Sequence, residues 1–212
     1  GNLMQNFIYG ETAFHHEGSF EYMLRMIDLA SETGLHGIKF QILIDLNDFV
    51  SRYHKNYDQM KSWVFTDKQW NKILIHAFNK NLKIIAMPCD IKAVDYITTA
   101  YSKINYCELH SVNFNDIKIL NRIKDTNIPT IISCGGRSID EVIKLCEFFG
   151  NQVFTIMHGY QSFPSNLREV KLHRIRILRE MFPEFLIGYA DHTAYNDEFS
   201  VKALEYAYLL GA

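Results

Sequence analysis

The chain alternates short apolar runs of β character with segments of helical periodicity along almost its whole length. Adjacent parallel strands need a crossover connection, and a helix supplies it, so this alternation predicts a parallel sheet. The apolar runs are continuous, which is typical of strands that are buried on both faces. The predicted strands are Phe7–Tyr9, Gly37–Ile42, Ile84–Met87, Tyr106–Leu109, Thr130–Ser133, Val153–Met157 and Phe185–Tyr189.

Capping signals predict helices between these strands. Thr66 and Gln69 form one capping box, and Ser138 and Glu141 form a second, each ahead of an apolar stripe. The last helix is expected over residues 197–210. These elements make about seven strand–helix units, one fewer than a closed eight-stranded barrel, so we expect a barrel that is incomplete in this chain.

The repeat itself is compatible with a closed barrel or with an open doubly wound sheet. No glycine-rich nucleotide-binding pattern follows any predicted strand, which removes support from the nucleotide-binding open sheets. The one long irregular stretch, residues 44–65, is rich in Tyr, Asn and Asp and is expected to cover one end of the sheet.

Bulk composition indicates one compact domain spanning residues 1–212, with 48% hydrophobic and 22% charged residues. The net charge of −2 provides no basic face, so we expect no nucleic-acid partner. No apolar run approaches the roughly 18 residues that a membrane span needs. The four cysteines lack paired spacing, and we expect buried reduced thiols and a cytoplasmic location.

Polar side chains gather where the predicted strands end. In parallel barrels, ligands bind at the carboxyl ends of the strands, which we call the rim. Lys39 stands inside an apolar strand, where a lysine is costly unless it is paired, and this favours a role in a site. The residues of this kind are Glu11, His15, His16, Lys39, Gln41, Cys89, Asp90, His110, Ser111, Asn113, Ser133, His158, Gln161, Asp191 and His192.

Several of these residues belong to segments that resemble the signatures of the sialic acid synthase (NeuB-type) family. The segments are ETAFHHEG at 11–18, GIKFQ at 37–41 and GYADHT at 188–193, with IISCG at 131–135 similar to a further family turn. The resemblance runs in order from about Phe7 to Ala212. It implies a parallel (β/α) TIM-type barrel that lacks its last strand–helix unit here, without the family's C-terminal antifreeze-like domain, and a homodimer.

The resemblance also implies an activity. The family condenses phosphoenolpyruvate with an N-acylated amino sugar to form a nine-carbon sialic-type acid, assisted by Mn²⁺ or Mg²⁺. It implies catalytic roles for Glu11 at the sugar and Lys39 at phosphoenolpyruvate, phosphate contacts from Ser111 and Ser133, and metal binding by His192. The further substrate-binding residues expected at this site are His16, Gln41, Asn113 and Gln161.

The chain departs from the family's pattern at several site positions. Glu108 stands where the family has a second phosphate-binding lysine, and Asn113 stands where a sugar-contacting glutamate is usual. Met87, Gln161 and Ala190 replace a threonine, an asparagine and a serine. Since a glutamate beside a phosphate replaces attraction by repulsion, phosphoenolpyruvate is expected to bind more weakly than in the family, or the substrate differs.

Two other hypotheses stay open beside the synthase. The first is a non-catalytic or re-purposed relative that binds a sugar on the same barrel, because a fold does not fix a function. The second is an aldolase-type barrel in which Lys39 forms a Schiff base with a carbonyl substrate.

Overall fold

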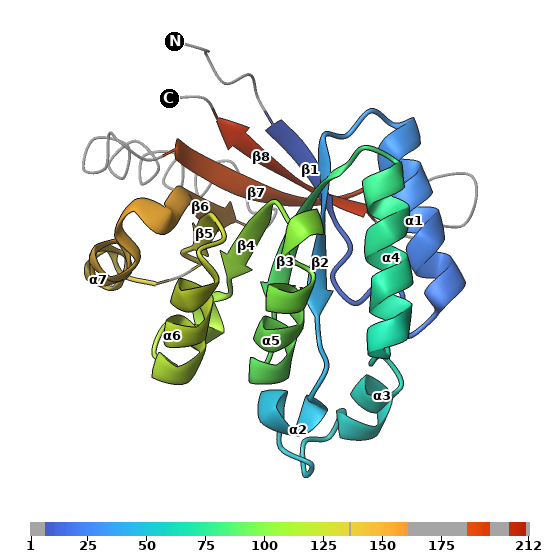
Figure 1. Ribbon diagram of the computed structural model, residues 1–212, viewed down its shortest axis with the longest axis horizontal. Coiled ribbons are helices and arrows are strands. Elements are labelled where there is room, and N and C mark those ends of the chain that lie inside the picture. The colour runs from blue at the N-terminus through green and yellow to red at the C-terminus, as the bar shows by residue number, and fades with distance from the viewer. Residues whose placement is uncertain (1–6, 136, 161–185, 196–203, 211–212) are drawn as a thin grey trace.

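The computed structural model describes residues 7–135, 137–160, 186–195 and 204–210, and for Tyr101, 158–160, 186–195 and 204–210 it describes the backbone alone. Within this part of the chain the strands close into a barrel in the order β1 to β8 (Figure 1). The strands are β1 (Phe7–Glu11), β2 (Gly37–Ile42), β3 (Lys83–Pro88), β4 (Tyr106–Leu109), β5 (Thr130–Ser133), β6 (Val153–Tyr160), β7 (Leu186–Tyr195) and β8 (Leu204–Leu210).

The parallel barrel predicted from the sequence is confirmed. Each strand from β1 to β6 pairs in parallel with the next strand along the chain, so β1 to β7 form a parallel sheet. The carboxyl ends of these strands therefore lie on one side of the barrel, as an active site at the rim requires.

The helix expected over residues 197–210 is wrong for residues 204–210, which form β8. This strand pairs antiparallel with both β7 and β1. Without it the two flanking strands would present unpaired backbone groups at open edges, and pairing satisfies those groups. Leu204–Leu210 also contains two tyrosines, which suit a strand. The contacts available at the barrel edges thus outweigh the local helical pattern.

The helices cover the outer side of the barrel (Figure 1). Both predicted capping boxes are present: the Thr66 hydroxyl accepts from the Gln69 N–H at 3.1 Å, and the Ser138 hydroxyl accepts from the Glu141 N–H at 3.3 Å. The helices are α1 (Phe20–Glu32), α2 (Leu46–Phe49), α3 (Tyr57–Lys61), α4 (Asp67–Asn79), α5 (Ile91–Thr99), α6 (Ile117–Thr126) and α7 (Ile139–Phe149), with short 3-10 turns η1 (Tyr101–Lys103), η2 (Ser111–Asn113) and η3 (Gly150–Gln152).

Side chains of β2 alternate between two cores. Ile38, Phe40 and Ile42 pack in the large apolar core between the strands and the helices. Gly37 and Lys39 face the interior of the barrel instead, because successive residues of a strand point to opposite sides.

The floor of the barrel interior is apolar and aromatic. A small core made of Tyr9, Ile85, Ile131 and Met157 fills it, and the ring of Phe7 packs beside it. A Cβ atom on Gly37 would lie 2.8 Å from the Phe7 ring. Glycine at this position therefore leaves room for the Phe7 ring to pack against the small core. The polar site described below therefore rests on a tightly packed base.

The stretch 44–65 covers the end of the sheet, as expected. It contains α2 and α3, which lie beyond the end of β2 in Figure 1. Leu46 and Met60 from this stretch pack against Leu43 and Cys89, which directly follow β2 and β3. The stretch is therefore a packed cover for the rim on this side of the barrel.

All four cysteines are free and buried, which confirms the prediction of buried reduced thiols. The cytoplasmic location inferred from them stays a prediction. Among the helices that the structure describes, none combines the length and the apolar character needed to cross a bilayer.

Candidate active site

Lys39 lies in the barrel interior in contact with two carboxylates. Its Nζ atom lies 3.1 Å from Oε1 of Glu11, its neighbour on β1, and it also contacts Oε2 of Glu108 on β4. The side chains of Lys39, Glu11 and Glu108 are at most 8% exposed. The expectation that a lysine inside this strand must be paired is therefore confirmed, and its partners come from two other strands.

Two neutral side chains complete this group. The hydroxyl of Tyr9 donates to Oε1 of Glu108 at 3.2 Å, and Nε2 of Gln41 donates to Oε1 of Glu11 at 3.1 Å. Tyr9 also belongs to the apolar floor, so it joins the floor to the polar layer above it. We call Tyr9, Glu11, Lys39, Gln41 and Glu108 the Lys39 cluster.

The cluster holds its charges in a buried environment. Burial by itself would lower the pKa of the Lys39 ammonium, but the charges and hydrogen bonds of Glu108 and Glu11 outweigh burial and raise that pKa. Burial raises the pKa of the Glu108 carboxyl, and the charge of Glu11 adds to the effect while Lys39 opposes it. Lys39 therefore stays protonated, and burial favours the protonated form of the Glu108 carboxyl.

The predicted phosphate contacts are Ser111 and Ser133. Ser111 lies in the loop that follows β4, and Ser133 is the last residue of β5, where the next loop begins. Ser111 opens η2, and Gly135 lies two residues beyond Ser133. Gly135 has φ +54°, and a Cβ atom there would lie 3.2 Å from the Ser111 hydroxyl oxygen. The two loops thus touch one another at the rim, and a larger residue at 135 would press on Ser111.

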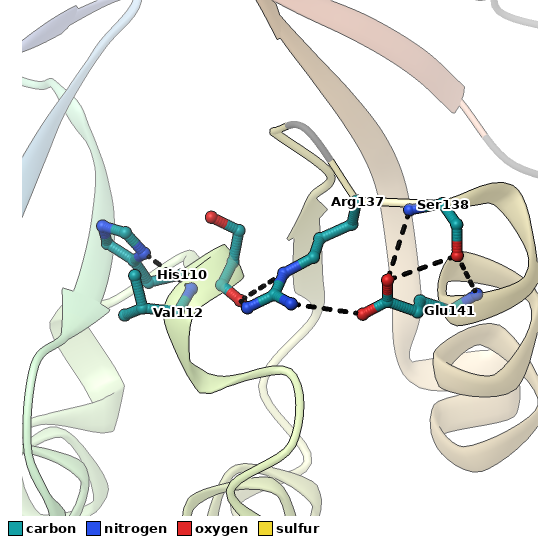
Figure 2. A network of polar contacts seen from close by, with 6 residues as sticks. His110, Val112, Arg137, Ser138 and Glu141 are labelled. Atoms are coloured by element: carbon teal, nitrogen blue, oxygen red, sulfur yellow. Dashed lines mark hydrogen bonds and ion pairs between the residues drawn. The ribbon is translucent and has the colours of Figure 1, made fainter.

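Arg137 fixes this contact between the loops (Figure 2). Its Nε and Nη2 atoms donate to the carbonyl oxygen of Ser111 at 3.1 and 2.9 Å, and its Nη1 donates to Glu141 at 3.4 Å. Its guanidinium also lies 5.8 Å from the ring centre of Phe114. Arg137 follows the fifth predicted strand, among the polar residues expected at the rim, but no specific role was predicted for it. Its position in the sequence, directly after Gly135-Gly136 and before the capping box of Ser138, was the available signal.

His110 and Asn113 flank Ser111 on the same loop. His110 caps η2, because its Nδ1 accepts from the Val112 N–H at 3.1 Å (Figure 2). Burial and the nearby charge of Lys39 lower the pKa of His110. The Nδ2 of Asn113 is buried without a hydrogen-bond partner in the described part of the chain, so this predicted substrate contact has an available donor.

His16 holds the loop after β1. Its ring is 2% exposed and lies 4.5 Å from that of Phe65, while its Nδ1 accepts from the Gly18 N–H at 2.8 Å. Burial, assisted by the charge of His15, lowers the pKa of His16 from 6.5 to about 4. His16 was expected to bind substrate, but its contacts favour a structural role, in which this neutral histidine shapes the loop.

Three further predicted residues, His158, Asp191 and His192, lie on the later strands. His192 follows Asp191 in β7. The Cα atom of Asp191 pairs with that of Tyr160, the last residue of β6, so the backbone of His192 lies at the rim. His158 lies in β6, and Gln161 lies outside the described residues. Among the residues that the structure describes, no group of three or more His, Cys, Asp or Glu side chains is placed to hold a metal ion.

Comparison with known proteins identifies a family. The sequence model of the NeuB family matches residues 26–212. An N-acetylneuraminate-9-phosphate synthase of Drosophila melanogaster is 25% identical, over 100% of this chain and 59% of that protein. An N,N'-diacetyllegionaminic acid synthase of Campylobacter jejuni is 23% identical, over 90% of this chain and 62% of that protein. The chain thus spans less than two thirds of the length of these relatives.

Solved structures show the same fold. The N-acetylneuraminic acid synthetase of Leptospira borgpetersenii, in complex with citrate, superposes with a TM-score of 0.77 at 24% identity, over 88% of this chain and 65% of that one. The spore coat polysaccharide biosynthesis protein E of Chromobacterium violaceum superposes with a TM-score of 0.75 at 26% identity, over 87% and 58%.

Proposed function

The chain belongs to the NeuB family, and from this premise we propose that the complete protein condenses phosphoenolpyruvate with an N-acylated amino sugar to form a nine-carbon sialic-type acid. The observation that carries this proposal is the position of Lys39. It is a protonated lysine inside the barrel, with Glu11 and Gln41 beside it. The names of the relatives as synthases of sialic-type acids support the same reaction.

Each site residue has a task in this reaction. Lys39 would attract the anionic groups of phosphoenolpyruvate, and the hydroxyls of Ser111 and Ser133 would donate to its phosphate. Glu11 would accept hydrogen bonds from the sugar. The methylene carbon of phosphoenolpyruvate forms a bond to the aldehyde carbon of the sugar. Water adds at the carbon that bears the phosphate and gives one proton to the former aldehyde oxygen, which becomes a hydroxyl. The C–O bond to phosphate then breaks, so that phosphate leaves and a ketone forms.

We propose His192 as one ligand of a divalent cation, Mn²⁺ or Mg²⁺. When bound, such a cation polarises the sugar aldehyde as a Lewis acid. The backbone position of His192 at the rim supports this assignment. The described residues contain no group of three or more His, Cys, Asp or Glu side chains that could supply the other ligands. We also propose that the complete protein works as a homodimer in the cytoplasm.

A second candidate function is a sugar-binding relative without phosphoenolpyruvate chemistry, and the contact between Lys39 and Glu108 favours it. Two like charges about 4 Å apart repel by about 1 to 4 kcal/mol, depending on the dielectric environment. An anionic substrate that reached Lys39 would meet this repulsion from Glu108. Calorimetric binding of an amino sugar, with no binding of phosphoenolpyruvate, would support this candidate.

The Schiff-base hypothesis loses support. A Schiff base needs an unprotonated amine, whereas the carboxylates of Glu11 and Glu108 keep Lys39 protonated. Borohydride reduction in the presence of carbonyl substrates is expected to leave the mass of the protein unchanged.

The proposed function is tested by phosphate release. The complete protein, supplied with Mn²⁺, phosphoenolpyruvate and a panel of N-acylated amino sugars, is expected to release phosphate only when an accepted sugar is present. Lys39→Gln should abolish this release, and Lys92→Gln, at an exposed lysine of α5, is the matched control. A folded protein that releases no phosphate with any sugar would contradict the proposal.

A further inference from the structure

Glu108 faces the same point in the barrel that an anionic substrate would have to reach. It is 1% exposed, its Oε2 contacts the ammonium of Lys39, and its Oε1 accepts from the Tyr9 hydroxyl. Its neighbour Cys107 packs in the outer core, so the alternation of β4 directs Glu108 inward. A substrate anion and this carboxylate therefore compete for one ammonium.

The charged groups around Glu108 determine how a substrate anion and the Glu108 carboxylate compete for the Lys39 ammonium. Tyr9 and Glu11 face it from β1 and Lys39 faces it from β2, while its neighbours in the floor, Ile85 and Ile131, are apolar. With both carboxyls ionised, Glu11, Lys39 and Glu108 carry a net charge of −1. A phosphate dianion added to this buried group would raise the negative charge without a compensating cation from these residues.

We propose that Glu108 is a specificity-determining residue, which admits a phosphate-bearing substrate to Lys39 only when its carboxyl takes up one proton from solvent. The inference rests on the proposed function and deepens it. The proton binds as the substrate enters and returns to solvent when the site empties, so no other group needs to change its charge.

The hydrogen bonds of Glu108 indicate where the proton goes. Tyr9 donates to Oε1, so the proton binds at Oε2, the oxygen that contacts Lys39. Protonation of Oε2 converts this oxygen from an acceptor of the Lys39 hydrogen bond into a hydrogen-bond donor. Lys39 is released to bind the substrate's anionic group, and the new O–H can donate to the same group. Burial, which raises the pKa of the Glu108 carboxyl, acts in the same direction.

Calorimetry on the complete protein tests this inference. Phosphoenolpyruvate is titrated between about pH 7.5 and 9, where a phosphate ester has already lost its second proton, which leaves near pH 6. Two buffers with different ionisation enthalpies then give the number of protons bound. At each pH at which Glu108 is ionised in the free protein, the wild type is expected to take up about one proton, and its Kd should rise about tenfold per pH unit there. Glu108→Gln is expected to bind tightly with no proton uptake and a flat Kd.

Two further variants complete the design. Glu147→Gln, on the exposed face of α7, is the matched carboxyl-to-amide control and should behave like the wild type. Tyr9→Phe removes a hydrogen bond that favours the ionised carboxylate, so its Kd should start to rise at a higher pH. This variant keeps the test open if Glu108→Gln fails to fold.

The outcomes are distinct. Binding by the wild type with no proton uptake, and with the same pH dependence as Glu108→Gln, would overturn the inference and leave the proposed function standing. Binding by Glu108→Gln alone would support the inference, because it identifies Glu108 as the group that excludes the anion. If folded wild type and folded Glu108→Gln both fail to bind phosphoenolpyruvate, the inference and the proposed function are overturned together.

Discussion

The ammonium of Lys39 contacts the carboxylate of Glu108 inside the barrel, although 69 positions separate them in the sequence. In the family pattern a second lysine is expected at position 108. Here the substitution gives Lys39 an internal anionic partner, and with Glu11 the cluster carries more negative than positive charge. The described part of this site therefore carries a net negative charge, on a barrel scaffold that the solved structures share.

Removal of Lys39 should destabilise the protein. Lys39→Met leaves Glu11 and Glu108 buried without their ammonium partner, and breaking a buried pair in this way costs about 3 to 5 kcal/mol. Urea unfolding measures the free energy. The double variant Lys39→Met/Glu108→Gln should recover part of the loss, because one of the two unpaired charges is gone. Equal losses in the single and double variants would contradict the pairing.

His16 should make stability depend on pH. Its pKa is about 4 in the folded protein and 6.5 in the unfolded chain, so between these values the unfolded chain binds the extra proton. The free energy of unfolding should therefore decrease by up to about 3 kcal/mol as the pH falls from 6.5 to 4. His16→Gln should remove this part of the slope, and His54→Gln, at an exposed site, should keep it. An unchanged slope in His16→Gln would contradict the assignment.

Two glycines with similar backbone conformations should respond differently to alanine. Gly18 and Gly34 have φ +84° and +76°, and a side chain in this region costs about 1 to 2 kcal/mol. A Cβ atom on Gly34 would meet nothing within 4 Å, whereas one on Gly18 would overlap the Ser62 carbonyl. Thermal unfolding should show a small loss for Gly34→Ala and a much larger loss for Gly18→Ala. Similar losses would show that the loop around His16 moves to make room.

Arg137 should control the affinity for the phosphate group through Ser111. Arg137→Ala removes both donors to the Ser111 carbonyl, so phosphoenolpyruvate affinity should fall about tenfold, equivalent to about 1.4 kcal/mol. Arg122→Ala, which breaks an exposed ion pair with Asp95, is the control and should leave the affinity unchanged. Equal affinities in the two variants would show that Arg137 does not position Ser111 for binding.

The sequence was most informative where the structure depends on residues that are close together along the chain. The capping boxes at Thr66 and Ser138 are local hydrogen-bond patterns, and both are present as predicted. The continuous apolar runs likewise predicted the parallel strands from β1 to β7. In contrast, β8 depends on two barrel edges formed by strands far away in sequence, so residues 204–210 looked helical in isolation.

The sequence indicated which residues lie at the site better than it indicated which of them contact one another. The rule that a lysine inside a strand needs a partner was correct for Lys39, but the strand register decides that the partners are Glu11 and Glu108. The contact of Arg137 with Ser111 was not predicted, because it is made to a backbone carbonyl, which no residue type reveals. The substrate and metal roles of all the predicted site residues stay predictions: Glu11, His16, Lys39, Gln41, Ser111, Asn113, Ser133, Gln161 and His192.

A crystal structure of the complete protein with phosphoenolpyruvate tests the central claim most directly. We predict density for the three-carbon phosphate at the rim, with an anionic group on Lys39 Nζ and the phosphate within hydrogen-bond distance of Ser111 and Ser133. Density in another part of the molecule, or an intact contact between Lys39 and Glu108 with no ligand at saturating phosphoenolpyruvate, would contradict it.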